Sequence, residues 1–166
     1  MTVDKDLFRQ VAGSFASGVT VVTTGLDGNY HGMTASSFSS LSLDPPLILV
    51  CFDLTAATLA AVDATGAFVI NILGSQQEQL SRQFASRGAH SLDDVDFELG
   101  ELGIPVLQDT IAHFECRVAR QHIEGDHVIL VGEVIAGAVD RGDDPLLYFR
   151  GSYRRLDALP DLQPVR

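Results

Sequence analysis

Short runs of β-branched and apolar residues recur along this chain, and they limit its fold more than any other feature. Glycine, asparagine and aspartate separate neighbouring runs, as at 25–29 and at 124–126, where a hairpin is predicted. Six or seven short strands with helices between them predict a mainly β, α+β domain whose antiparallel strands form a closed or nearly closed barrel. The predicted strands are residues 19–24, 30–38, 47–52, 67–73, 114–123, 127–139 and 146–149.

Three segments have the composition of helices. Residues 4–16 repeat apolar side chains every four positions, with Asp4 or Thr2 as the N-terminal cap. Residues 55–65 are rich in alanine, which is the strongest helix former. A Ser-x-x-Glu capping box predicts that a third helix starts at Ser75.

The remaining segments predict how the chain is organised outside these elements. Residues 86–103 are acidic and irregular, which indicates a long surface excursion whose contacts the sequence leaves unassigned. Residues 157–166 contain two prolines and are predicted to form a fraying tail. Without an internal repeat or a linker, residues 1–156 are predicted to form one domain.

Composition and charge exclude several classes of protein. With 46% hydrophobic residues the chain is globular, and a formal net charge of −11 leaves no basic face for nucleic acid. Neither a leader segment nor an apolar stretch of 18 residues is recognisable, so a cytoplasmic protein is expected. Cys51 and Cys116 lie in separate apolar runs and are predicted to be buried free thiols.

The common nucleotide-binding and hydrolase motifs are missing. The chain has no Gly-x-Gly-x-x-Gly, no Walker loop, no Gly-x-Ser-x-Gly and no His-Glu-x-x-His. A nucleotide would therefore be held by loops and strand edges, not by a Rossmann turn. No metal site is predicted, because the histidines never fall at ligand spacing with cysteine or carboxylates. The histidines are His31, His90, His113, His122 and His127.

Three groups of residues are candidates for binding or catalysis, and each has a plain structural alternative. Thr-Ala-Ser-Ser at 34–37 suits the close approach of a phosphate ester, or a strand packed tightly on its neighbour. Arg82 is either a charge-assisted donor to a phosphate or a solvated helical charge. His127, after Gly125-Asp126, is either a ligand contact or an ordinary hairpin residue. Anions are also favoured at the predicted helix starts.

Six motifs follow one another along the chain: GVTVVT at 18–23, HGMTASSF at 31–38, LDPPL at 43–47, FVIN at 68–71, GDH at 125–127 and YFRGSY at 148–153. Together they resemble the short-chain flavin reductases, the reductase components of two-component flavin monooxygenases, over residues 4–156. The resemblance implies an FMN-binding split β-barrel of antiparallel Greek-key type, usually a homodimer with flavin near the interface. It also implies hydride transfer from NADH or NADPH to FMN or FAD, and release of reduced flavin to a partner monooxygenase.

The resemblance implies roles for individual residues as well. His127 would lie beside the nicotinamide and the flavin, as the residue with a catalytic role. Thr58 and Arg82 would approach the flavin phosphate, and Phe84 with Ala85 would touch the far side of the flavin. The other residues implied to bind the cofactor are Thr34, Ala35, Ser36, Ser37, Cys51, Phe52, Asp53, Tyr148 and Tyr153.

Two alternatives use the same barrel. Pyridoxamine-phosphate oxidases would need more basic residues for a substrate phosphate than the 11 Lys and Arg of this acidic chain. A flavin-binding module without turnover is the second alternative, and NADH oxidation in the presence of added flavin separates it from a reductase.

Overall fold

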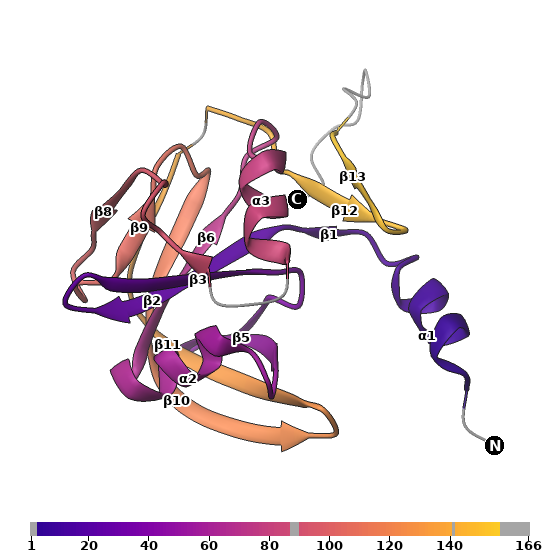
Figure 1. The fold of residues 1–166 in the computed structure, drawn as a ribbon, viewed down its shortest axis with the longest axis horizontal. Coiled ribbons are helices and arrows are strands. Elements are labelled where there is room, and N and C mark those ends of the chain that lie inside the picture. The colour runs from indigo at the N-terminus through magenta and orange to yellow at the C-terminus, as the bar shows by residue number, and fades with distance from the viewer. Residues whose placement is uncertain (1–2, 87–89, 141, 157–166) are drawn as a thin grey trace.

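A computed structural model describes residues 3–86, 90–140 and 142–156 of the protein. These residues form three helices and thirteen strands (Figure 1). The helices are α1 (Lys5–Ala12), α2 (Ala57–Thr65) and α3 (Glu78–Ala85). The strands are β1 (Ser17–Gly18), β2 (Thr20–Leu26), β3 (Asn29–Ala35), β4 (Ser39–Leu43), β5 (Pro46–Asp53), β6 (Ala67–Ile72), β7 (His90–Ser91), β8 (Phe97–Leu99), β9 (Pro105–Leu107), β10 (Ala112–Glu124), β11 (His127–Val139), β12 (Leu147–Phe149) and β13 (Ser152–Arg154).

Eight of the strands form one antiparallel sheet in the order β4-β5-β11-β10-β6-β2-β3-β7. Ser37, between β3 and β4, extends the pairing of β4 with β5. Its hydroxyl donates to the carbonyl of Cys51 on β5 at 3.1 Å and accepts from the amide of Cys51 at 3.0 Å. The mainly β, antiparallel architecture predicted from the sequence is confirmed.

The barrel interior holds the main hydrophobic core. Along β5, Ile48, Val50 and Phe52 are buried, while Leu49 and Cys51 on the opposite face are only half-buried. The inward side chains pack against those of β6, β10, β11 and α2. A fully buried apolar side chain contributes about 1.5–3 kcal/mol to folding stability, so the contribution of β5 comes from its inner face. The side chains on the outer face of β5 are not part of this core.

Residues 90–103 of the acidic excursion contain more regular structure than their composition indicates. It contains β7 and β8, and Leu92 is buried in a second core cluster. The following strand, β9, is fixed to the barrel by Asn71, whose amide donates to the carbonyl of Val21 and whose Oδ1 accepts from the amide of Leu107 at 2.9 Å. Buried Glu115 accepts from the amide of Leu102 at 2.9 Å. Hydrogen bonds between residues far apart in the sequence therefore hold this region in place, and a local sequence pattern does not reveal them.

Three local predictions were wrong. The first helix stops at Ala12, because the chain leaves it at Gly13 to pair as β1. The third begins at Glu78, since the hydroxyl of Ser75 donates to the carboxylate of Asp143 at 3.0 Å instead of capping a helix. The strand predicted at 30–38 ends at Ala35, and β4 pairs with β5 as a separate hairpin. The predicted tail at 157–166 lies outside the described residues, as does Thr2.

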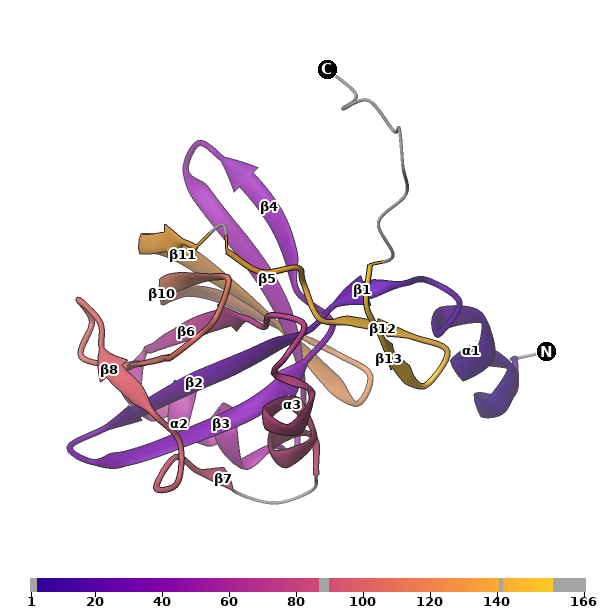
Figure 2. The same ribbon diagram turned by 90° about the horizontal axis from the view of Figure 1, so that it is seen from above.

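Helix α1 projects from the barrel beside the β12–β13 hairpin (Figure 2). It buries none of its residues, and Leu7, Phe8 and Val11 are 46–67% exposed. Within the described part of the chain, no helix is long and apolar enough to cross a membrane.

Candidate functional site

A cavity of about 470 Å³ lies on the outside of the barrel, where β3, the start of α2 and the end of α3 meet. Its volume is within the usual range of small-ligand sites. Phe84 of α3 is buried against β3, where Gly32 has no side chain: a Cβ there would lie 2.6 Å from the ring. Five residues predicted from the sequence meet here. The lining residues are Met33, Thr34, Asp53, Thr55, Ala56, Ala57, Thr58, Phe84, Ala85 and Ser86.

The N-terminus of α2 opens into this cavity without a cap of its own. Ala56 occupies the N-cap position and makes no side-chain hydrogen bond, and the first turn holds no acidic residue. The hydroxyl of Thr58 is buried and donates to the carbonyl of Gly32 at 3.2 Å, so it holds α2 against β3. Backbone N–H groups and the positive end of the helix dipole therefore face the cavity, a combination suited to a phosphate.

His127 lies at one edge of the site. It is the register partner of Asp53 across β5 and β11, and directly opposed residues point to the same face of a sheet. The amide of Leu54 donates to the carbonyl of Asp126 at 3.1 Å, which ties the hairpin turn to the strand end that lines the cavity. The side chain of His127 is 48% exposed, and its Nδ1 lies 2.7 Å from Oδ1 of Asp126. An exposed imidazole thus lies on the same face of the sheet as Asp53, which lines the cavity.

Several predicted residues serve the barrel itself. Ala35 and Phe52 have buried side chains in the main core, so only their backbone is available to a ligand from outside. The Ser37 hydroxyl is engaged with Cys51, whereas Ser36 is exposed. Cys51 is half-buried, in contrast to the prediction of a buried thiol, because it points to the outer face of β5.

Arg82, Tyr148 and Tyr153 form a second group around the side of α3. The guanidinium of Arg82 lies 4.8 Å from the ring centroid of Tyr153, and that ring packs edge-on against Tyr148 at 5.3 Å. Arg82 also binds Glu78 at 2.8 Å, and this hydrogen bond raises the pKa of the guanidinium. The group joins the cavity through Ser81, which binds the Tyr153 hydroxyl at 2.8 Å and accepts from Thr34 at 2.7 Å.

Five lining residues were not among the individual site residues predicted from the sequence, although the helix predicted to start at residue 55 was expected to favour an anion: Met33, Thr55, Ala56, Ala57 and Ser86. Thr55 had a detectable signal, since its amide and hydroxyl both donate to Asp53 two residues earlier, at 2.8 and 2.6 Å. The two alanines had no side-chain signal, because what they bring to the cavity is backbone.

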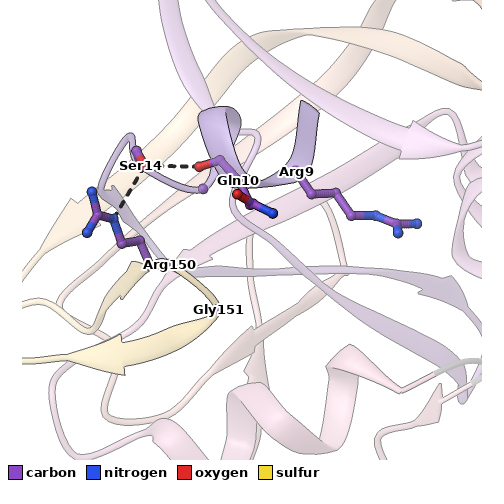
Figure 3. Close-up of a pocket in the computed structure, with 6 residues that line it drawn as sticks. Arg9, Gln10, Ser14, Arg150 and Gly151 are labelled. Carbon is purple, nitrogen blue, oxygen red and sulfur yellow. Dashed lines mark hydrogen bonds between the residues drawn. The ribbon is translucent and has the colours of Figure 1, made fainter. Parts of the chain in front are cut away.

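A second cavity, of about 460 Å³, lies between α1 and the turn that joins β12 to β13. Arg150 donates to the hydroxyl of Ser14 at 3.3 Å, and Ser14 donates to the carbonyl of Gln10 at 2.9 Å (Figure 3). The guanidinium groups of Arg9 and Arg150 point in different directions and do not converge on a shared ligand position (Figure 3). We interpret these contacts as the anchor of α1.

Other chemistry in the described residues is limited. Cys116 is buried, and burial, with a smaller effect of Glu115, raises the pKa of its thiol to about 12, so this thiol stays protonated. Across residues 3–86, 90–140 and 142–156, no three His, Cys, Asp or Glu side chains gather in an arrangement that would hold a metal ion.

The arrangement fits a flavin nucleotide. An antiparallel barrel carries, on its outer face, a cavity with an aromatic side chain and an uncapped helix N-terminus suited to a phosphate, and a histidine is paired with one of the lining residues. These features suit a nucleotide held by strand edges and loops in place of a Rossmann turn. Residues 12–157 match the family described as flavin reductase like domain, and the chain belongs to that family.

Relatives of known activity cover nearly the whole chain. It is 42% identical over 148 residues to the FMN reductase (NADH) SmoA of Agrobacterium fabrum, covering 89% of this chain and 84% of the relative. Identity to HsaB, the reductase subunit of a flavin-dependent monooxygenase of Rhodococcus jostii, is 36% over 155 residues, or 93% and 80% of the two chains. The solved structure of the Streptomyces globisporus NADH:FAD oxidoreductase SgcE6 with NAD and FAD fragments matches with a TM-score of 0.89 at 38% identity, covering 97% and 99%.

Proposed function

We propose that this protein is an NADH-dependent flavin reductase that reduces FMN or FAD and supplies the reduced flavin to a partner monooxygenase. The observation that carries the proposal is the meeting of Thr58, Phe84 and the uncapped start of α2 in one cavity, with His127 paired across the sheet with a lining residue, Asp53. The names of the relatives support the cosubstrate, the flavin and the place in a two-component system.

The bound flavin would supply the hydride acceptor, and the residues of this chain would bind and orient the two rings. Backbone N–H groups at Ala57 and Thr58 would hold the flavin phosphate, with the helix dipole favouring its charge. Exposed Ser36 would present its backbone N–H to the ring system, where it favours negative charge. His127 would orient the nicotinamide, and stacking two rings at hydride distance requires no proton donor from the protein.

The proposal is tested by anaerobic stopped-flow absorbance with catalytic FMN or FAD and either NADH or NADPH. Bleaching of the flavin with NADH is expected, and the absence of bleaching with both nicotinamides would overturn the proposal. It would leave the flavin-binding module without turnover as the function.

His127→Ala assigns the nicotinamide contact. We expect kcat/KM for NADH to fall, and the fall should correspond to a loss of about 1–3 kcal/mol of transition-state stabilisation. The flavin dissociation constant should change less. The control is His122→Ala, an exposed histidine on β10 of the same hairpin, which should behave as wild type. If His127→Ala kept the wild-type kcat/KM for NADH, His127 would be an ordinary hairpin residue without a role in binding the nicotinamide.

We also infer that the protein is a homodimer. A helix of 8 residues that buries none of them is unstable alone, so the apolar side chains of α1 need a partner surface. Light scattering should return twice the chain mass of 17.8 kDa. Val11→Glu on α1, where Val11 is 67% exposed, should yield monomer, and Leu99→Glu on β8, where Leu99 is 54% exposed, should not. A wild-type protein of one chain mass would contradict the inference.

A cytoplasmic location follows from the proposed reaction. NADH is a cytoplasmic cosubstrate, and both cysteines are free thiols, as expected in a reducing compartment. Fractionation with detection of the protein in the cytoplasmic fraction tests this inference.

A further inference from the structure

The turn before β11 places a carboxylate directly on the ring of the proposed nicotinamide contact. Asp126 and His127 are neighbours in the chain, and Gly125, with a φ of 64°, makes the turn that brings their side chains to the same point. Oδ1 of Asp126 lies 2.7 Å from Nδ1 of His127, a short distance typical of a charge-assisted hydrogen bond. The contact is within the hairpin and needs no other element.

The chemistry of the pair decides which ring nitrogen carries the proton. The hydrogen bond to His127 is the largest of the causes that lower the pKa of Asp126, so Asp126 is a carboxylate at neutral pH. A carboxylate only accepts hydrogen bonds, and Nδ1 of His127 must therefore be the donor. Nε2 is then the nitrogen left for a ligand.

Other charged groups surround the same ring. Glu124 on β10 and Asp53 on β5 are the register partners of His127, and His122 lies further along the same face of β10. Glu124 has the same charge as Asp126 but makes no hydrogen bond to the ring within the described residues. A variant of Glu124 therefore separates the effect of a nearby negative charge from the effect of a hydrogen bond to Nδ1.

We propose that Asp126 is a positioning residue: it holds Nδ1–H of His127 and so fixes the tautomer and the ring orientation that present Nε2 to the nicotinamide. The inference rests on the proposed function for its kinetic consequence, but the geometry of the pair stands without it. Because Asp126 is 93% exposed, the pair adds little to stability, and its removal leaves the hairpin folded.

The experiment compares Asp126→Ala, Asp126→Asn and Glu124→Gln in the full chain, with kinetics and ¹⁵N NMR of the imidazole rings. In Asp126→Ala we expect kcat/KM for NADH to fall about tenfold with little change in the flavin dissociation constant. Asp126→Asn should recover part of the loss, because its side-chain oxygen still accepts from Nδ1. Glu124→Gln should remain within about twofold of wild type, since it removes charge without contact.

The NMR measurement keeps the inference testable if the protein proves not to oxidise NADH. At alkaline pH the His127 ring should carry its proton on Nδ1 in the wild type, and the proton should redistribute between the two nitrogens in Asp126→Ala. A wild-type ring protonated on Nε2, or an unchanged tautomer in Asp126→Ala, would overturn the inference whatever the kinetics. Unchanged tautomer ratios with normal NADH oxidation would leave the proposed function intact and remove only the role of Asp126.

Discussion

Helices α1 and α2 begin in opposite ways. Oδ1 of Asp4 accepts from the amides of Asp6 and Leu7, both at 2.9 Å, so α1 satisfies its own first turn. At the start of α2, Ala56 offers only a methyl group, and no acidic residue follows in the first turn. The capped end lies on a projecting helix, and the uncapped end lies in the cavity. The difference supports the proposal that the flavin phosphate binds at the start of α2, since a helix end normally finds partners for its N–H groups.

Helix α3 strengthens this comparison. Its N-cap residue, Gln77, also makes no capping bond, but Glu78 places a negative charge in the first turn. The side chain of Gln77 accepts from the amide of Gly74 at 3.0 Å instead. Among the helices of the described residues, α2 alone has neither a capping side chain nor an acidic first turn, and it alone opens into the candidate site.

The largest expected effect comes from giving α2 the cap that α1 has. Ala56→Asp should weaken FMN binding at least about tenfold, because the carboxylate takes the N–H groups and repels the phosphate. Riboflavin, which has no phosphate, should lose much less. Fluorescence titration with both ligands measures the difference, and thermal unfolding should give an equal or higher Tm.

Ala56→Asn is the matched control, since it caps the helix without adding charge. We expect its effect on FMN to lie between those of wild type and Ala56→Asp. If Ala56→Asp weakened FMN and riboflavin equally, the cavity would be obstructed and the helix end would not be the phosphate site.

A smaller effect in the opposite direction is expected from Ala57→Ser. Ala57 lines the cavity in the first turn of α2, so a hydroxyl there would add a donor to the bound phosphate. We expect FMN affinity to rise about threefold, the lower part of the range for one hydrogen bond. Equilibrium titration against riboflavin again isolates the phosphate. A gain that is equal for both ligands would place the hydroxyl elsewhere.

Much of the barrel was predictable, because β-branched runs and turn residues act locally. Runs 114–123 and 127–139 became the β10–β11 hairpin with its turn where glycine and aspartate indicated it. Ser75 had the pattern of a capping box, yet its hydroxyl binds Asp143, a partner 68 positions away that no local pattern reveals. The short strand β4 is rich in serine and becomes a strand through pairing with β5.

The site was less predictable for a different reason. Side chains with distinctive chemistry, such as those of His127 and Arg82, are visible in a sequence. The contribution of Ala56 and Ala57 is backbone N–H at a helix end, which the sequence indicates only through the predicted start of a helix at residue 55. Only the register of β5 with β11, and the packing of α2 and α3 on β3, bring these groups to one place.

The smallest expected effect is at the capped end, and it tests whether the two helix ends are independent. Asp4→Ala removes the oxygen that accepts from Asp6 and Leu7, which should cost about 1 kcal/mol of local helix stability. Hydrogen exchange of the α1 amides should accelerate about fivefold, because the lost cap acts on the first turn of α1. Asp4→Asn, which keeps the accepting oxygen, should exchange as wild type. FMN affinity should not change in either variant, since α1 lines only the other cavity. If Asp4→Ala weakened FMN binding as well, α1 would be coupled to the site through the dimer, and its capped end could no longer serve as the ligand-free counterpart of α2.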